Sequence, residues 1–361
     1  MTLLPALFTA LLTPAQAAEV TELAPMLRGD VQVRYDLDAE RGRLMEAGDP
    51  VGRRALTNHQ VTWSGSFSFY SGAALFVEMP YMASERVRFD DATAMTYDPI
   101  LDRGTLVGSD PLRGGQPTVG SGLGGTWVGL RGAPYHQDLF ADRGDRASLL
   151  FEAAWRFQDD TNFWTYGPRG ERGGGAGAPA FRLRGAFSTQ HRSAEPYLAA
   201  TWTVPSRIRT DVVAPNGRTV AQGLTLRPAS EVELLAGAEL NVHEYQEGGA
   251  LALDFRSRFG YRSWQDIPSG LYLPSVLDAS EGLAATESDY VYLSGSFGLN
   301  WRIVHYLQWN VSGEFGVTSP RRIEHFYPVS TGMGTHTWGV TTALRFRVRD
   351  DLFEKVQPAP L

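Results

Sequence analysis

The stretch Trp338-Gly-Val-Thr-Thr-Ala-Leu-Arg-Phe-Arg-Val348 decides how the rest of the chain is interpreted. Apolar or β-branched side chains occupy every second position from Trp338 to Val348, whereas Arg345 and Arg347 fall between them. Successive side chains of a β-strand point to opposite faces of a sheet, so this pattern predicts a strand with one apolar and one polar face. Two arginines on the polar face favour a barrel with an apolar outer surface and a polar lumen.

The same alternation recurs along the chain and predicts twelve strands, with ten or fourteen left open. The segments lie near 30–37, 61–69, 74–81, 122–131, 149–158, 181–188, 197–204, 231–243, 251–262, 290–302, 307–315 and 338–348. The segment at 122–131 is rich in glycine, and which face it turns outward is ambiguous. An even count puts both ends of the chain on the same side of the barrel.

The connections between these segments alternate in length. Long polar links lie near 38–57, 84–120, 159–179, 205–229, 263–287 and 318–335, and shorter turns near 71–72, 134–146, 189–195, 246–249 and 303–305. Outer-membrane barrels have short periplasmic turns and longer extracellular loops, whereas a β-sandwich has no such rhythm. We therefore predict an all-β fold: a transmembrane, antiparallel, up-and-down β-barrel of about twelve strands.

The composition agrees with export to the bacterial outer membrane. The chain has 361 residues, no cysteine and a formal net charge of −7. Without cysteine there is no disulfide framework or thiol chemistry, and the mild acidity gives no reason to expect nucleic acid as a partner. Residues 1–18 have an apolar middle and an Ala15-Gln16-Ala17 pattern, which predicts a secretory signal. The barrel would then occupy 19–348, and 349–361 would form a periplasmic tail.

Two short motifs carry a family resemblance. The first is Val77-Glu78-Met79-Pro80-Tyr81, which ends a strand before a long link, and the second is the glycine-rich run from Gly120 to Arg131. Together they resemble the barrels identified as transporters of the phenol-degradation MetA pathway and, more loosely, the long-chain fatty-acid transporter barrels. Gly125 stands where that family usually carries aspartate. The resemblance implies passage of small, apolar or aromatic compounds and brings no catalytic residue.

Charged side chains on the polar faces are the candidate site. Arginine at the middle of the lipid face costs about 2–4 kcal/mol, so these groups are expected to line the lumen. They are Arg156, Arg182, Arg184, Arg256, Arg258, Arg345, Arg347, Glu78, Glu152, Glu233, Glu239, Asp254 and Glu314. Such residues can select permeating solutes by charge. Alternatively, they fill a narrow barrel with cross-strand ion pairs: Glu233 and Glu239 beside the Arg256/Arg258 strand, and Arg345 and Arg347 beside Asp30 and Asp36.

Motifs for other chemistry are weak. Gly120, Gly122 and Gly125 satisfy Gly-x-Gly-x-x-Gly, but a strand follows them rather than the helix that a dinucleotide site requires. The seven histidines show no metal-ligand spacing, and His191-Arg192-Ser193 falls in a short turn away from the rim where a barrel lipase needs its catalytic residues. We predict no catalytic residue, no metal and no cofactor.

The predicted function is an outer-membrane channel or transporter for small molecules. The alternative is a closed structural or adhesion barrel whose loops near 84–120 and 205–229 bind partners, and a lipid-degrading enzyme is a third hypothesis. Outer-membrane lipid and lipopolysaccharide are the expected surroundings, with Arg103, Arg113, Arg169 and Arg172 as candidate phosphate contacts. The permeant, the direction of transport, an open or plugged lumen and the oligomeric state are left open.

Overall fold

The computed structural model describes residues 28–46, 49–70, 72–90, 94–98, 103–107, 118–135, 147–157, 172–173, 178–191, 193–213, 219–245, 249–268, 284–304, 306–324 and 330–348. The predicted signal at 1–18 and the predicted tail at 349–361 lie outside these ranges. Among the described residues, none form a helix long and apolar enough to cross a membrane.

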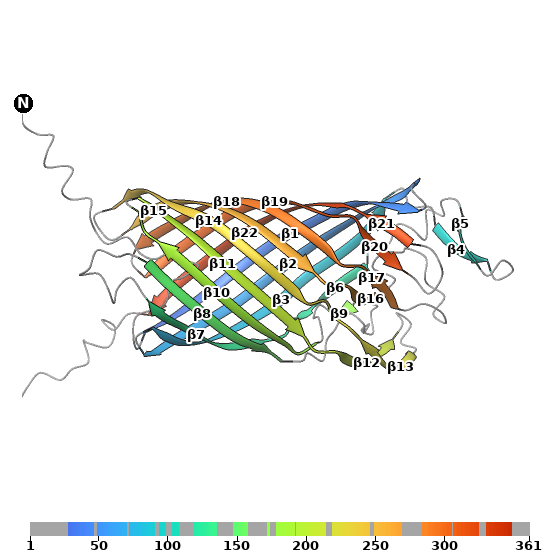
Figure 1. The fold of residues 1–361 in the computed structure, drawn as a ribbon, viewed down its shortest axis with the longest axis horizontal. Helices are drawn as coiled ribbons and strands as arrows, with labels where there is room; N and C mark the ends of the chain where they lie inside the picture. Colours follow the sequence, from blue (N-terminus) through green and yellow to red (C-terminus); the bar gives the residue numbers. More distant parts are fainter. Residues whose placement is uncertain are drawn as a thin grey trace, which may run out of the picture.

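Twelve long strands close into a barrel (Figure 1). In chain order they are β1 (Gly29–Glu46), β2 (Asp49–Tyr70), β3 (Ala73–Asp90), β7 (Trp127–Tyr135), β8 (Ala147–Arg156), β10 (Ala180–Thr189), β11 (Ala194–Pro205), β14 (Glu231–Glu244), β15 (Ala250–Arg262), β18 (Tyr290–Val304), β19 (Leu307–Thr318) and β22 (Thr335–Val348). Each pairs antiparallel with the next, and β22 pairs with β1. The predicted fold class and strand number are confirmed.

The closing strand has the two faces that its sequence predicts. β1 and β22 pair without a register shift from Gly29↔Val348 to Gly42↔Thr335. Leu344 and Phe346 are 51% and 43% exposed, whereas Arg345 between them is only 7% exposed. The apolar side chains therefore face outward and the arginine faces the interior, the reverse of a protein that folds in water.

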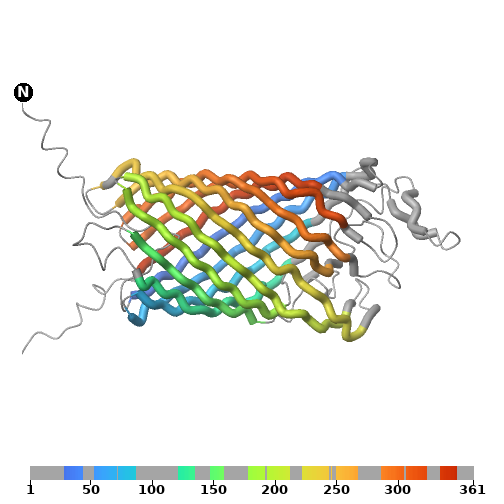
Figure 2. Tube along the Cα trace, in the orientation of Figure 1, coloured from blue at the N-terminus to red at the C-terminus, as the bar shows by residue number. Residues whose placement is uncertain are grey.

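The same reversal holds around the whole wall. Each of the twelve long strands carries exposed large apolar side chains at alternate positions, among them Val33, Phe151, Leu198 and Phe297. The strands cross the wall obliquely (Figure 2). Only every second residue meets lipid in such a barrel, so the average hydropathy stays low although the outer surface is apolar. The described outer surface is that of a membrane protein.

One predicted link is wrong. We expected a loop at 38–57, but β1 continues to Glu46 and β2 begins at Asp49, so a long hairpin extends this side of the wall. Its outward positions carry arginine instead of apolar residues, because this part of the hairpin has passed the lipid. Pairing in the sheet needs only backbone groups, so the strands continue although the amphipathic pattern has stopped.

Other predicted links contain short strands. They are β4 (Ala94–Asp98), β5 (Arg103–Val107), β6 (Thr118–Leu123), β9 (Arg172–Gly173), β12 (Ile208–Val213), β13 (Thr219–Leu226), β16 (Gln265–Pro268), β17 (Ala284–Glu287), β20 (Arg321–Glu324) and β21 (Ser330–Met333). β16 pairs with β17, β17 with β20, β20 with β21, and β21 with β1. These four strands extend the wall beyond the ends of β15, β18, β19 and β22 (Figure 1).

The glycine-rich segment forms two strands rather than one. β6 ends at Leu123 and β7 begins at Trp127, and both pair with β3. Between them, a Cβ on Gly124 would lie 2.9 Å from Cγ of Pro80, so the strands approach more closely than a side chain allows. Val128 and Leu130 face outward and Trp127 inward, which resolves the ambiguity of this segment.

Candidate functional site

A cavity of about 470 Å³ lies within the barrel, enclosed by residues from most of the long strands. Of the predicted lumen residues, Glu78, Arg184, Asp254, Arg256, Arg258, Glu314 and Arg345 line it. Hydroxyl and amide side chains from β1, β2, β18, β19 and β22 line one side: Gln32, Gln60, Thr62, Ser64, Ser66, Ser296, Asn300, Asn310, Ser312 and Thr341. Phe76, Leu150 and Leu235 provide apolar surface on the other side. The lining is therefore mainly polar.

Four charged side chains form a network on β3, β7, β8 and β10. Glu152, whose side chain is 1% exposed, accepts hydrogen bonds from Nε of Arg131 at 2.8 Å and Nε of Arg182 at 2.9 Å. Glu78 completes the network, at 3.3 Å from Arg131 and 3.1 Å from Arg182. Each guanidinium meets two carboxylates, which its planar fork of donors allows and an ammonium group would not. The chain has a single lysine, Lys355.

Aromatic rings pack against the same arginines. The guanidinium of Arg131 lies 4.1 Å from the centroid of the Phe76 ring, and that of Arg182 lies 4.7 Å from the Trp127 ring. Phe76 and Trp127 are buried inside the barrel. A cation over a ring face gains about 0.5–2 kcal/mol, so these rings and the carboxylates together hold the arginines in place.

Three aromatic residues each lie opposite a glycine on the neighbouring strand. Phe76 pairs with Gly129, Tyr197 with Gly237 and Tyr292 with Gly260. A Cβ on any of these glycines would overlap the facing ring. The absent side chain lets the tyrosines reach past the glycine strand: Tyr197 donates to Asp254 at 2.6 Å, and Tyr292 donates to Glu231 at 2.6 Å and Glu233 at 2.9 Å.

The other predicted charges lie in smaller groups. Arg258 is 3.3 Å from both Glu233 and Glu314, Arg256 is paired with Asp254, and Arg345 is 2.8 Å from Asp30. Glu239 accepts a hydrogen bond from Asn300 at 3.2 Å. Arg156 lies 5.2 Å from the Trp127 ring and donates to the carbonyl of Ala178. Arg347 alternates with the outward Phe346 but is not among the residues lining the cavity.

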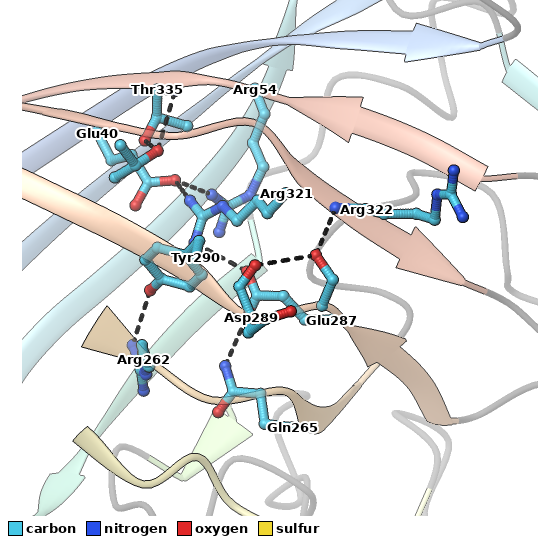
Figure 3. A network of polar contacts seen from close by, with 12 residues as sticks. Glu40, Arg54, Arg262, Gln265, Glu287, Asp289, Tyr290, Arg321, Arg322 and Thr335 are labelled. Atoms are coloured by element: carbon cyan, nitrogen blue, oxygen red, sulfur yellow. Dashed lines mark hydrogen bonds and ion pairs between the residues drawn. The ribbon is translucent and has the colours of Figure 1, made fainter. Parts of the chain in front are cut away.

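A second network lies on β1 and β2 beyond their cavity-lining residues and includes residues of β16, β17 and β20 (Figure 3). Arg321 is paired with Glu40 and, at 2.8 Å, with Glu287. Arg54 donates to Glu40 at 2.9 Å, and Gln265 donates to Glu287. Arg54, Arg321 and Glu287 are at most 4% exposed. We missed this network because its members fall in segments that we had interpreted as loops.

Other residues were also missed. Arg131 lies in the segment whose facing was ambiguous, and Arg34 and Asp38 line the cavity from β1. Among the described residues, no group of three or more histidine, aspartate or glutamate side chains is arranged to hold a metal ion. His191 lies in the turn between β10 and β11, where its N–H donates to the carbonyl of Ala194 at 2.7 Å.

The comparisons with known proteins concern the fold. No protein-family model matches the sequence, and no curated protein matches it significantly. Solved structures that match include an outer membrane channel from Pseudomonas putida F1, with 10% identity, a TM-score of 0.47 and coverage of 92% of this chain and 100% of that one. The β domain of the Bordetella autotransporter BrkA matches with 14% identity, a TM-score of 0.42 and coverage of 89% and 100%.

A third match is a FadL homologue from Pseudomonas aeruginosa, with 10% identity, a TM-score of 0.39 and coverage of 89% and 90%. The closed antiparallel wall, its apolar exterior and its charged interior lead to one conclusion. The chain is a twelve-stranded transmembrane β-barrel of the bacterial outer membrane.

Proposed function

We propose that the barrel is a channel for small polar molecules, which cross through its lumen. The observation that carries this proposal is the cavity of about 470 Å³ with its hydroxyl, amide and charged lining. Sites for small molecules have volumes of about 300–1,000 Å³, so the space suits a molecule of that size.

The charges on the cavity wall are balanced. Six arginines line it (Arg34, Arg131, Arg184, Arg256, Arg258 and Arg345), as do six carboxylates (Asp30, Asp36, Asp38, Glu78, Asp254 and Glu314). A lumen with equal numbers of both signs has no strong preference for anions or cations. We therefore expect neutral or zwitterionic polar solutes to pass most readily. The apolar or aromatic cargo implied by the family resemblance would find little apolar surface beyond Phe76, Leu150 and Leu235.

Conductance in a planar bilayer tests this function. The refolded chain 19–361 is expected to give discrete steps with weak charge selectivity. Arg258→Gln removes the cation between Glu233 and Glu314, so the ratio of cation to anion permeability should rise. Phe315→Leu, at an outward position that is 74% exposed, serves as the control and should leave the ratio unchanged. A folded barrel that carries no current would contradict the proposal.

The second candidate is a closed barrel that binds partners through its loops. The β12–β13 hairpin, within the predicted loop at 205–229, forms a two-stranded sheet separate from the barrel wall and supports this alternative. Removal of 208–226 should abolish partner binding if this is the function and should leave conductance intact if the barrel is a channel.

Liposome swelling in amino acids and neutral sugars, compared with protein-free liposomes, provides a second measure of transport through the proposed channel.

A further inference from the structure

Outward-facing arginines replace apolar residues at one level of the wall. On β1 the outward positions carry Val31, Val33, Tyr35, Leu37 and Ala39, followed by the exposed Arg41 and Arg43. β1 pairs with β22 in unbroken register up to Gly42, so the two faces do not exchange along this length.

The neighbouring strands add two more arginines. Arg53 on β2 lies directly opposite Arg43, and Arg86 on β3 lies opposite Thr57, which itself faces Ala39 on β1. Both arginines are exposed. Only small residues separate the four in register, namely Ala39, Ala55 and Thr57. We call Arg41, Arg43, Arg53 and Arg86 the arginine patch.

Three of these four arginines are unpaired as far as the described residues show. Within the described part of the chain, Arg41, Arg43 and Arg86 form no ion pair or hydrogen bond through their side chains, and Arg53 lies opposite Asp90 in register. Like charges directly opposite on neighbouring strands repel, as Arg43 and Arg53 do. A bound anion would remove this repulsion.

The height of the patch matches the edge of a membrane. The ten residue steps from Val31 to Arg41 span about 33 Å along a strand, which is about 25 Å along the membrane normal at a tilt near 40°. The apolar band of outer-membrane barrels is also about 25 Å tall.

The patch lies at the end of the barrel that belongs outside the cell. The first and last strands begin and end together at the opposite end, where Gly29 pairs with Val348. Short turns join the strands at that opposite end, which identifies it as periplasmic. The arginines therefore meet the headgroups of the outer leaflet.

We propose that the arginine patch binds the phosphate groups of a phosphorylated glycolipid in the outer leaflet. Guanidinium groups bind phosphate through two parallel hydrogen bonds, and no bulky side chain stands between the arginines, where Ala55 and Thr57 are half-buried. The acyl chains of the same lipid would lie along the outward positions directly below the patch, which on β1 are Leu37 and Tyr35. This interaction is independent of whether the lumen conducts.

The test is retention of bisphosphorylated lipid A by the refolded full-length barrel, measured by native mass spectrometry after extraction from mixed micelles. The pair Arg41→Gln and Arg43→Gln is expected to weaken retention about 30-fold, because each arginine near an anionic lipid surface contributes about fivefold. Arg86→Gln alone should weaken it about fivefold. The control pair Arg207→Gln and Arg209→Gln removes two exposed arginines beside the β12–β13 hairpin and should leave retention unchanged.

Three results would overturn the proposal. In the first, the patch variants retain lipid A as well as the unmodified barrel does. In the second, the control pair loses as much retention as the patch pair. In the third, inorganic phosphate displaces lipid A completely, which would mean that the acyl chains do not contribute. Dephosphorylated lipid A should be retained equally by all variants. The shift of the folded band in unheated electrophoresis samples verifies that every variant is folded.

Discussion

Arg53 and Arg54 are adjacent in the sequence, yet their surroundings differ completely. Arg54 faces the interior, is 4% exposed and donates to Glu40 at 2.9 Å. Arg53 faces outward, is exposed and lies opposite another arginine on β1. The period of two sends one guanidinium into a buried ion pair and the other toward the membrane edge.

The comparison extends to the whole barrel. Interior arginines such as Arg131, Arg182 and Arg321 each contact two carboxylates, because a charge inside the barrel needs a partner. Outward arginines such as Arg41 and Arg43 are exposed, so their charge can be solvated without a carboxylate beside it. The inside of this barrel is thus held by paired charges, and the outside by lipid.

Removal of an interior carboxylate should have the largest effect. Glu152→Gln leaves Arg131 and Arg182 with only Glu78, and Glu152 is almost completely buried. The free energy of unfolding is expected to fall by roughly 3–5 kcal/mol, the usual cost of breaking a buried ion pair. Urea titration in phospholipid vesicles measures it.

Glu314→Gln is the matched control for Glu152→Gln. Its side chain is 34% exposed and lies 3.3 Å from Arg258, so a loss below about 1 kcal/mol is expected. Equal losses for the two variants would show that burial does not determine the strength of these pairs.

A methyl group on Gly260 should have an intermediate effect. Gly260→Ala pushes the Tyr292 ring away and breaks its hydrogen bonds to Glu231 and Glu233. The expected loss of unfolding free energy is about 2 kcal/mol, typical of overpacking. At Gly295 the nearest atom to an added Cβ is 3.9 Å away, so Gly295→Ala should be nearly neutral. If both variants unfold like the unmodified barrel, the close packing of Tyr292 on Gly260 is not needed.

Substitutions of the adjacent Arg53 and Arg54 should differ least in their effect on the free energy of unfolding. Arg54→Gln is expected to cost about 1.5 kcal/mol, because it removes a charged hydrogen bond from a buried site. Arg53→Gln should stay within about 0.5 kcal/mol, as exposed substitutions usually do. Urea titration of the two single variants in phospholipid vesicles measures the difference. A larger loss for Arg53→Gln than for Arg54→Gln would mean that Arg53, and not Arg54, faces the interior.

The strands that cross lipid were predictable, and the segments beyond them were not. Val31 to Leu37 alternates because lipid requires an apolar residue at each outward position. From Arg41 onward the outward positions of the β1–β2 hairpin no longer carry large apolar residues in regular alternation, so the sequence resembles a loop although the backbone pairing continues. The network of Glu40, Arg321 and Glu287 was missed for this reason.

Which side chains pair with one another inside the lumen depends on the register between strands. The sequence predicts that Glu78 and Arg182 both face inward, but they are 104 residues apart, and only the closed wall places them 3.1 Å from each other. Likewise, no local pattern predicts that Gly260 lies opposite Tyr292. Long side chains reach across one or two strands, so their contacts depend on how every strand between them is aligned.

The sequence by itself determined the all-β class, a barrel of about twelve transmembrane strands and, outside the glycine-rich segment at 122–131, which residues face lipid, because alternation is a local property that the bilayer enforces along each strand. Only the tertiary structure decided which carboxylate meets which arginine, how the wall extends beyond the membrane and which outward arginines gather into one patch. These features arise from the pairing of segments distant in sequence, and the geometry of a closed barrel sets that pairing.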